Sequence, residues 1–284
     1  MQLRRVLAGI SLQAPNPRAA LTAAEIAAVA HAELEVLTVL ANPWELVHAD
    51  EVEGLRRARL GSPADVAARR ACERLEQLAG PAVLAAPRVS YRAAFGWPSV
   101  ELVRHAEESG ADLIVLGSSG AAPLGPAEDV TPATLRRSRV PVLVAPPVHE
   151  VYQRVLACVD DSPHAARVLE AAATLGDSFG IHTVALHVEP ASSAILSGGG
   201  RRPWLTRLEE GASRGGGGTA LALETIVRQG DVVSEVMNEA TSGPDALIVF
   251  GYHRGMNYGA AGAVTTVTAR LLRRATSALL AVPV

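Results

Sequence analysis

The chain has 284 residues, of which 49% are hydrophobic and 19% are charged, so its length suggests about two domains with enough apolar material for packed cores. Its formal net charge is −3 and no basic stripe stands out, which argues against a nucleic-acid partner. All 26 basic residues are arginine, and the lack of lysine excludes P-loop proteins and Schiff-base enzymes, which both use a lysine amine.

The first half of the chain alternates apolar runs with alanine-rich or charged stretches. We expect strands at residues 5–10, 35–40, 88–93, 112–116 and 141–145, and helices at residues 19–31, 53–78, 98–108 and 132–137. The first run is apolar almost throughout, which is typical of a strand buried on both faces. The Gly-Ser-Pro sequence at residues 61–63 predicts a break in the long helix.

The second half repeats this alternation. We expect strands at residues 154–159, 182–188, 220–227, 246–250 and 278–282, and helices at residues 164–175, 232–240 and 265–274. No run approaches the roughly 18–20 apolar residues that span a membrane. The apolar run at the start of the chain ends too early for a signal peptide. We therefore expect a soluble, cytoplasmic protein.

The two halves are related by an internal repeat. Residues 5–8 read Arg-Val-Leu-Ala, and residues 154–157 read the same. We take residues 1–147 and 151–284 as two tandem domains. Five strands that alternate with helices predict, in each, an α/β fold with a five-stranded parallel sheet and helices on both faces. Such sheets bind ligands beyond the carboxyl ends of their strands, where the strand order reverses. The residues that follow the first and fourth strands are therefore the candidates.

A glycine-containing segment follows the fourth strand of each domain. Residues 117–120 read Gly-Ser-Ser-Gly, and residues 251–255 read Gly-Tyr-His-Arg-Gly. The next helices start near Thr131 and near Thr265-Thr266. Glycines let backbone N–H groups approach an anion, and a helix N-terminus favours phosphate. The alternative is a tight turn followed by a threonine N-cap, with no ligand.

The first strand of the second domain runs into Asp160-Asp161-Ser162-Pro163. Ser162 before Pro163 is explained by N-capping of the following helix. That role leaves Asp160 unexplained, at the carboxyl end of a strand where a ligand would lie. In the first domain the corresponding residue is Ser11.

These features resemble the universal stress protein family, over essentially the whole chain and as a tandem two-domain member. The repeated Leu-Arg-Arg before a final apolar strand, at residues 135–137 and 272–274, belongs to the same pattern. The family signature is Gly-x-x-Gly, nine residues, then Gly-Ser or Gly-Thr. The resemblance implies bound ATP, or AMP or ADP, and a possible Mg²⁺. The glycine loop and hydroxyl would hold the phosphates. The aspartate after strand one and the backbone near the end of strand two would hold adenine.

The first domain carries this signature in part. It keeps Gly117 and Gly120, and Thr131 stands for the hydroxyl, but the third glycine is lost. With Ser11 in place of the aspartate, this site is expected to be eroded.

The second domain is the better candidate for a nucleotide. It keeps Asp160, and Val188 closes its second strand. Arg254 or His253 could pair with phosphate and offset lost amide contacts.

The glycine loop of the second domain departs from the signature in two places. Gly251 and Gly255 are separated by three residues rather than two. Thr265-Thr266 replaces Gly-Thr, so Thr266 can supply the hydroxyl, while the side chain of Thr265 would crowd the phosphates.

Some residues that suggest other chemistry have simpler explanations. Residues 176–180 spell Gly-Asp-Ser-Phe-Gly, but a helix precedes them and a strand follows, so we expect a helix C-terminus and no nucleophile elbow. His187 is expected to be a hydrogen-bonded core histidine. Cys72 and Cys158 have no cysteine or histidine neighbour at metal-ligand spacing, which argues against zinc and disulfides. Cys158 is expected in the core.

The expected function is therefore non-catalytic binding of an adenine nucleotide, and the resemblance implies a stress or dormancy role. A second hypothesis is a scaffold that has lost nucleotide binding and acts through protein contacts. A third is a slow ATPase, by fold analogy alone. The last strands, at residues 143–145 and 279–282, are apolar edge candidates. The resemblance implies that they pair across a pseudo-two-fold within one chain. Whether two chains also associate into a homodimer is not readable from the sequence.

Overall fold

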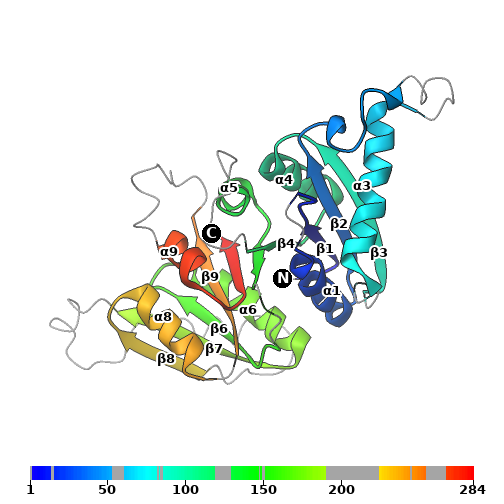
Figure 1. The fold of residues 1–284 in the computed structure, drawn as a ribbon. Coiled ribbons are helices and arrows are strands. Elements are labelled where there is room, and N and C mark those ends of the chain that lie inside the picture. The colour runs from blue at the N-terminus through cyan, green and yellow to red at the C-terminus, as the bar shows by residue number, and fades with distance from the viewer. Residues whose placement is uncertain are drawn as a thin grey trace. The chain divides into compact units, whose positions relative to one another are not determined.

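The structure is a computed structural model that describes residues 2–13, 16–52, 61–81, 83, 86–118, 129–146, 148, 151–189, 224–243, 245–253 and 267–284. The chain divides into two compact units, Gln2–Pro147 and Val148–Val284, which we call the N-terminal unit and the C-terminal unit. Each unit is a sheet with helices against it (Figure 1).

The N-terminal unit contains five parallel strands in the order β3-β2-β1-β4-β5. Its elements are β1 (Arg5–Gly9), α1 (Arg18–Ala30), β2 (Glu33–Leu40), the 3-10 helix η1 (Pro43–Glu45), α3 (Pro63–Ala79), β3 (Arg88–Phe95), α4 (Pro98–Ser109), β4 (Leu113–Gly117), α5 (Val130–Arg137) and β5 (Val142–Ala145). Helix α1 packs on β1, β2 and β4, and α4 packs on β2 and α5. Right-handed crossovers place α1 and α3 on one face and α4 and α5 on the other (Figure 1).

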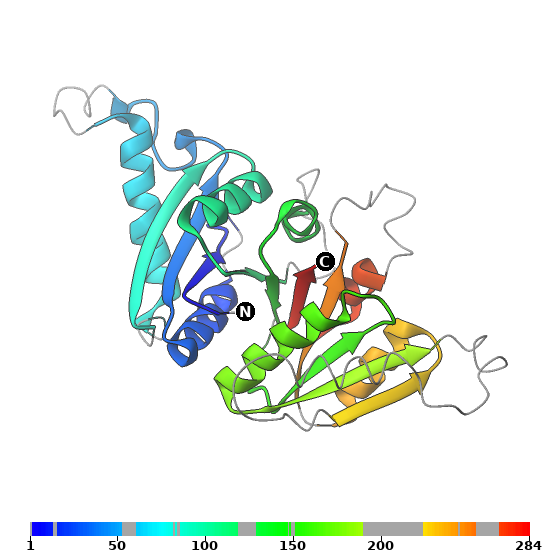
Figure 2. The ribbon, with the colours of Figure 1, turned by 180° about the vertical axis from the view of Figure 1, so that it is seen from behind.

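The C-terminal unit has the corresponding order β10-β9-β6-β7-β8. Its elements are β6 (Arg154–Val159), α6 (Ala165–Phe179), β7 (His182–Glu189), β8 (Glu224–Gln229), α8 (Val232–Thr241), β9 (Ala246–Tyr252), α9 (Val267–Arg274) and β10 (Leu279–Pro283). Helix α6 packs on β6, β7 and β9, while α8 packs on β7, β9 and α9. Figure 2, seen from behind, shows α6 across the strands of this unit.

The repeat found in the sequence extends to the strand register. Arg5 of β1 lies opposite Glu33 of β2, and Arg154 of β6 lies opposite His182 of β7. In each unit the first strand is also paired with the fourth, β1 with β4 and β6 with β9. The predicted fold of two α/β domains with parallel sheets is confirmed, and every predicted strand is present.

Some strands are longer than the sequence predicts, because contacts with residues distant in the sequence extend them. Strand β2 begins at Glu33, two residues earlier than expected, because the Glu33 carboxylate is held by Arg5 of β1 at 2.8 Å and by Arg88 of β3 at 2.6 Å. Strand β9 continues to Tyr252, since β10 pairs with it to that residue. The expected starts at residues 53–60 and 220–223 lie outside the described residues.

The predicted break in the long helix is the start of α3. Ser62 accepts a hydrogen bond from the Asp65 backbone N–H at 3.2 Å, and the Asp65 carboxylate accepts one from the Ser62 N–H at 2.8 Å. Pro63 supplies the first helical residue, where its missing N–H costs nothing. Gly61 has φ of 97°, a conformation that glycine adopts readily.

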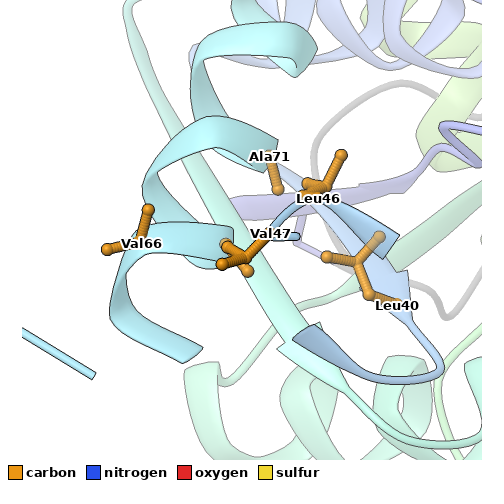
Figure 3. Packing of buried hydrophobic residues seen from close by; sticks show 6 residues of the cluster. Leu40, Leu46, Val47, Val66 and Ala71 are labelled. Carbon is orange, nitrogen blue, oxygen red and sulfur yellow. The ribbon is translucent and has the colours of Figure 1, made fainter. Parts of the chain in front are cut away.

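A hydrophobic cluster ties α3 to the carboxyl end of β2. Leu40 ends the strand, Leu46 and Val47 follow η1, and Val66 and Ala71 face them from α3 (Figure 3). Leu12, which follows β1, and Phe95, at the end of β3, pack against this cluster. The cluster therefore fixes the segments that leave β1, β2 and β3 at one edge of the sheet.

Replacement of Gly251 tests how closely α6 approaches β9. A Cβ atom at Gly251 would lie 3.1 Å from Val168 Cγ2 and 3.3 Å from Val284 Cγ1, while one at Gly117 would meet nothing nearer than Asn16 Nδ2 at 3.7 Å. We expect Gly251→Ala to lower the free energy of unfolding in urea by about 1 kcal/mol. Gly117→Ala, the matched control, should not lower it. Equal losses in the two variants would contradict this packing.

An ion pair between α8 and α9 predicts a pH-dependent contribution to stability. Asp231, the N-cap of α8, accepts hydrogen bonds from Arg270 at 2.6 and 2.8 Å and from the Ser234 N–H at 3.0 Å. The Arg270 guanidinium, together with the hydroxyl and the backbone N–H of Ser234, holds the pKa of Asp231 well below its ordinary value. The ionised carboxylate is thus favoured in the folded state, so its stabilisation is present above about pH 4 and declines as the pH falls further.

We therefore expect Arg270→Gln to lower the urea midpoint at pH 7. The gap from the unsubstituted chain should narrow as the pH falls below about 4. Arg273→Gln, at an exposed position of the same helix, is the control and should have little effect. A gap that stays constant with pH would show that Arg270 acts through packing alone.

Candidate functional site

The carboxyl edge between β6 and β9 is where the strand order of the C-terminal unit reverses. After β6 the chain crosses to β7 on one side, and after β9 it crosses to β10 on the other. The two connections diverge, and such a reversal leaves a crevice for ligands in parallel α/β sheets. Asp160 follows β6, and His253 follows β9.

Asp160 is exposed at this edge and is held by its own loop. Its carboxylate accepts a hydrogen bond from the Ser162 N–H at 3.1 Å, and the Ser162 hydroxyl accepts one from the His164 N–H at 3.3 Å. The N-cap of α6 is His164, so the prediction that Ser162 is the N-cap is wrong. The helix starts later because the turn at Ser162 and Pro163 precedes it. The Asp160 carboxylate is thereby fixed with access to solvent.

The end of β7 lies beside Asp160. Val188 is partly exposed near the end of this strand. His187 is buried, and its Nδ1 lies 2.9 Å from the carbonyl oxygen of Val159, the last residue of β6. Because a carbonyl oxygen only accepts, Nδ1 is the donor. The prediction of a hydrogen-bonded core histidine is confirmed, and this bond joins β7 to β6 one residue before Asp160.

The predicted glycine loops begin inside strands. Gly117 is the last residue of β4, and Gly251 lies within β9, followed by the buried Tyr252. Gly251 pairs with Val282 of β10, and the space beside it is filled by Val168 and Val284. Gly251 therefore lets α6 and the end of the chain pack closely on β9, whereas a side chain at Gly117 would meet only ordinary van der Waals contacts. The other residues predicted for these loops and the helix start that follows lie outside the described residues: Gly120, Arg254, Gly255, Thr265 and Thr266.

A contact between two histidines joins the segments that follow β6 and β9. The imidazole rings of His164 and His253 have centroids 5.7 Å apart and planes at 80°. The sequence alone did not predict this contact, because the two histidines lie far apart along the chain. The sequence did indicate that each histidine follows a strand at the point where the strand order was expected to reverse.

At the same edge of the N-terminal unit, polar groups are hydrogen-bonded to one another. Gln13, after β1, donates a hydrogen bond from Nε2 to the Glu45 carboxylate at 2.8 Å. Glu45 also accepts from the backbone N–H groups of Ala41 and Asn42, which directly follow β2. The Ser11 hydroxyl accepts from the Gln13 N–H at 3.2 Å. The N–H groups at the end of the second strand are thus already used within the chain.

Thr131 was predicted from the same resemblance as a phosphate-binding hydroxyl. It is buried and is the second residue of α5, whose N-cap is Asp129. The Thr131 side chain is therefore largely shielded from solvent at the start of α5.

Of two other predictions about reactive residues, the one for residues 176–180 is confirmed, whereas Cys158, expected in the core, lies in β6 and is partly exposed. Residues 176–180 form the C-terminus of α6, with Gly180 in the left-handed conformation at φ 65°. Ser178 donates its hydroxyl to the Thr174 carbonyl oxygen at 2.7 Å, as in an ordinary helix. Burial raises the pKa of the Cys158 thiol to about 12, so the thiol stays protonated at neutral pH and is a poor nucleophile.

The described residues contain neither a candidate metal site nor a candidate membrane span. No three side chains among His, Cys, Asp and Glu come together in this part of the chain as a metal ion requires. Of the helices it contains, none has the length and apolar character needed to cross a membrane.

Comparison with known proteins identifies the family. A model of the universal stress protein family matches residues 2–146 and again residues 151–283. The chain is similar to the crystal structure of a putative universal stress protein from Pseudomonas aeruginosa UCBPP-PA14, with 16% identity, a TM-score of 0.60, and coverage of 99% of this chain and 93% of that one. A universal stress protein from Archaeoglobus fulgidus DSM 4304 is 18% identical, with a TM-score of 0.60 and coverage of 100% and 99%.

A universal stress protein solved in complex with cAMP is 24% identical over 51% of this chain and 98% of its own, with a TM-score of 0.33. No curated protein matches the chain. The similarity to the first two structures extends over both units, and the family model matches each unit separately. The chain belongs to the universal stress protein family, as a member with two such domains in tandem.

Proposed function

We propose that the C-terminal unit binds one adenine nucleotide at the carboxyl edge of β6, β7 and β9, and that occupancy of this site regulates the protein. The observation that carries this proposal is the difference between the two units at corresponding positions. Asp160 is exposed at the reversal of strand order, whereas the same edge of the N-terminal unit has Ser11 and the hydrogen bond from Gln13 to Glu45.

The residues of the C-terminal edge fit an adenine nucleotide. The Asp160 carboxylate can accept a hydrogen bond from a ligand N–H or hydroxyl, because the Ser162 N–H engages only one of its oxygens. Backbone near Val188 would face the base from the neighbouring strand. Phosphates would extend toward the segment after β9, and a Mg²⁺ ion would come with the phosphates of ATP.

A binding role without turnover is supported by how the polar groups of this edge are used. The Asp160 carboxylate and the Ser162 hydroxyl both accept hydrogen bonds from backbone N–H groups of the same loop. The Ser162 hydroxyl has no hydrogen bond to a histidine ring among those that the described residues show. These contacts hold a loop in shape, whereas a nucleophile needs a base within hydrogen-bond reach.

A second function, protein contact without a nucleotide, is favoured for the N-terminal unit. At its edge Gln13 is hydrogen-bonded to Glu45. At the same edge Trp44, which follows β2, is 55% exposed, and Trp97, which follows β3, is 68% exposed. Exposed tryptophans are frequent anchors in protein interfaces. We propose that this unit binds a protein partner through an exposed surface rather than a nucleotide in a pocket.

Nucleotide content is the first test. We expect the purified full chain to release an adenine nucleotide on denaturation, and titration of the nucleotide-free chain with ATP to give one site per chain. ATP at millimolar concentration should raise the melting temperature, because a ligand that binds the native state stabilises it. An unchanged melting temperature and no released nucleotide would favour the scaffold function. Two sites per chain would show that the N-terminal unit also binds, and steady ADP release with Mg²⁺ would contradict a binding-only role.

Replacement of Asp160 tests the proposed anchor. Asp160→Asn should weaken ATP binding about tenfold, by the loss of one hydrogen bond to a charged group. Asp161→Asn, at the exposed neighbouring position, is the matched control and should not weaken ATP binding, because it removes only a negative charge that repels phosphate. Isothermal titration measures both, and urea unfolding checks that the variants remain folded. Equal affinities for the two variants would mean that another residue holds the nucleotide.

A further inference from the structure

The contact between His164 and His253 lies at the proposed site and is not part of the family signature carried over above. His164 is partly exposed at the start of α6, and His253 is exposed after β9. Their rings meet with centroids 5.7 Å apart. The two imidazoles therefore join the two chain segments that bound the reversal of strand order.

Packing beneath the histidines holds this contact in place. Val168, one helical turn after His164, is buried, and its Cγ2 would lie 3.1 Å from a Cβ atom at Gly251. Gly251 is two residues before His253, and the intervening Tyr252 is buried as well. Helix α6 and strand β9 are thus in close contact immediately below the two rings. The position of the two histidine rings is therefore determined by the buried packing of α6 against β9 as well as by the exposed side chains themselves.

The charges of this edge indicate what the histidines can recognise. Asp160 and Asp161 are exposed and acidic, so a phosphate at this edge meets negative charge from the loop after β6. Of the described residues in the two segments, Asp160 to His164 and His253, the two histidines alone can carry a positive charge. An imidazole donates an N–H to a phosphate oxygen when neutral and gains charge assistance when protonated.

We infer that His164 and His253 together bind the outer phosphates of the nucleotide, so that the site prefers nucleoside di- and triphosphates over the monophosphate and the nucleoside. This inference rests on the proposed function, because it assigns part of the same site. It adds the residues that distinguish ligands by their number of phosphates, while Asp160 and the backbone near Val188 hold the base.

Titration of the full-length chain with adenosine, AMP, ADP and ATP tests the inference. In the unsubstituted protein, affinity should rise from adenosine to ATP. His164→Ala and His253→Ala should each weaken ATP binding about tenfold and leave adenosine binding unchanged, because only the phosphate contacts are lost. His182→Ala is the matched control, since His182 is exposed at the opposite end of β7. Inorganic triphosphate, tested alone, should bind more weakly than ATP and lose affinity in the same two variants.

Three results would overturn the inference. Equal weakening of adenosine and ATP in the histidine variants would mean that the pair only supports the loops. Unchanged ATP affinity in both variants would place the phosphates elsewhere. Tight inorganic triphosphate binding that does not depend on these histidines would do the same. A failure of the proposed function is distinguishable, because the unsubstituted chain would then bind neither adenosine nor ATP.

Discussion

The first strand of each unit is paired on both sides and buried on both faces, and this constraint determines where polar side chains can gather. Strand β6 lies between β7 and β9, and Val155, Leu156 and Ala157 are fully buried. A strand with no free edge and no exposed face can present polar groups only beyond its ends. The reversal of strand order then brings the residue after β6 near the residue after β9. Asp160 and the two histidines occupy this edge because of the sheet.

The opposite, amino edge shows how the same scaffold has diverged. Arg5 and Arg154 hold corresponding positions at the start of β1 and β6. Arg5 pairs with Glu33 of the neighbouring strand, and both side chains are partly exposed. Arg154 is buried and pairs with Glu239 of α8, which also binds Arg228 at 2.8 Å. A buried pair of this kind is costly to break, typically about 3–5 kcal/mol, because one charge is left without a partner. The repeat therefore conserves the strand register more strictly than the contacts made by its side chains.

The sequence could predict the features that depend on local pattern, and it missed those that depend on contacts across the fold. Apolar runs located all the strands, and Ser62 with Pro63 located the start of α3. The extension of β9 to Tyr252 could not be read from the chain, because it depends on pairing with β10. The same holds for the hydrogen bond between Gln13 and Glu45 at the N-terminal edge, which joins the segments after two different strands. At the candidate site, Asp160 was recognisable from its place after a strand, whereas the partner of His164 was not.

The hydrogen bonds of Glu45 have a consequence for how the N-terminal unit responds to its surroundings. Gln13, Ala41 and Asn42 all donate to this one carboxylate, so the residue after β1 and the residues directly after β2 are held together by the fold itself. Part of their conformational entropy is therefore lost on folding, and less remains to be lost on association. Under the proposed function, this edge would present the same side chains in every nucleotide condition, whereas the C-terminal edge would present either its own side chains or the bound nucleotide. A partner that touches both units would then meet one constant surface and one variable surface on the same chain.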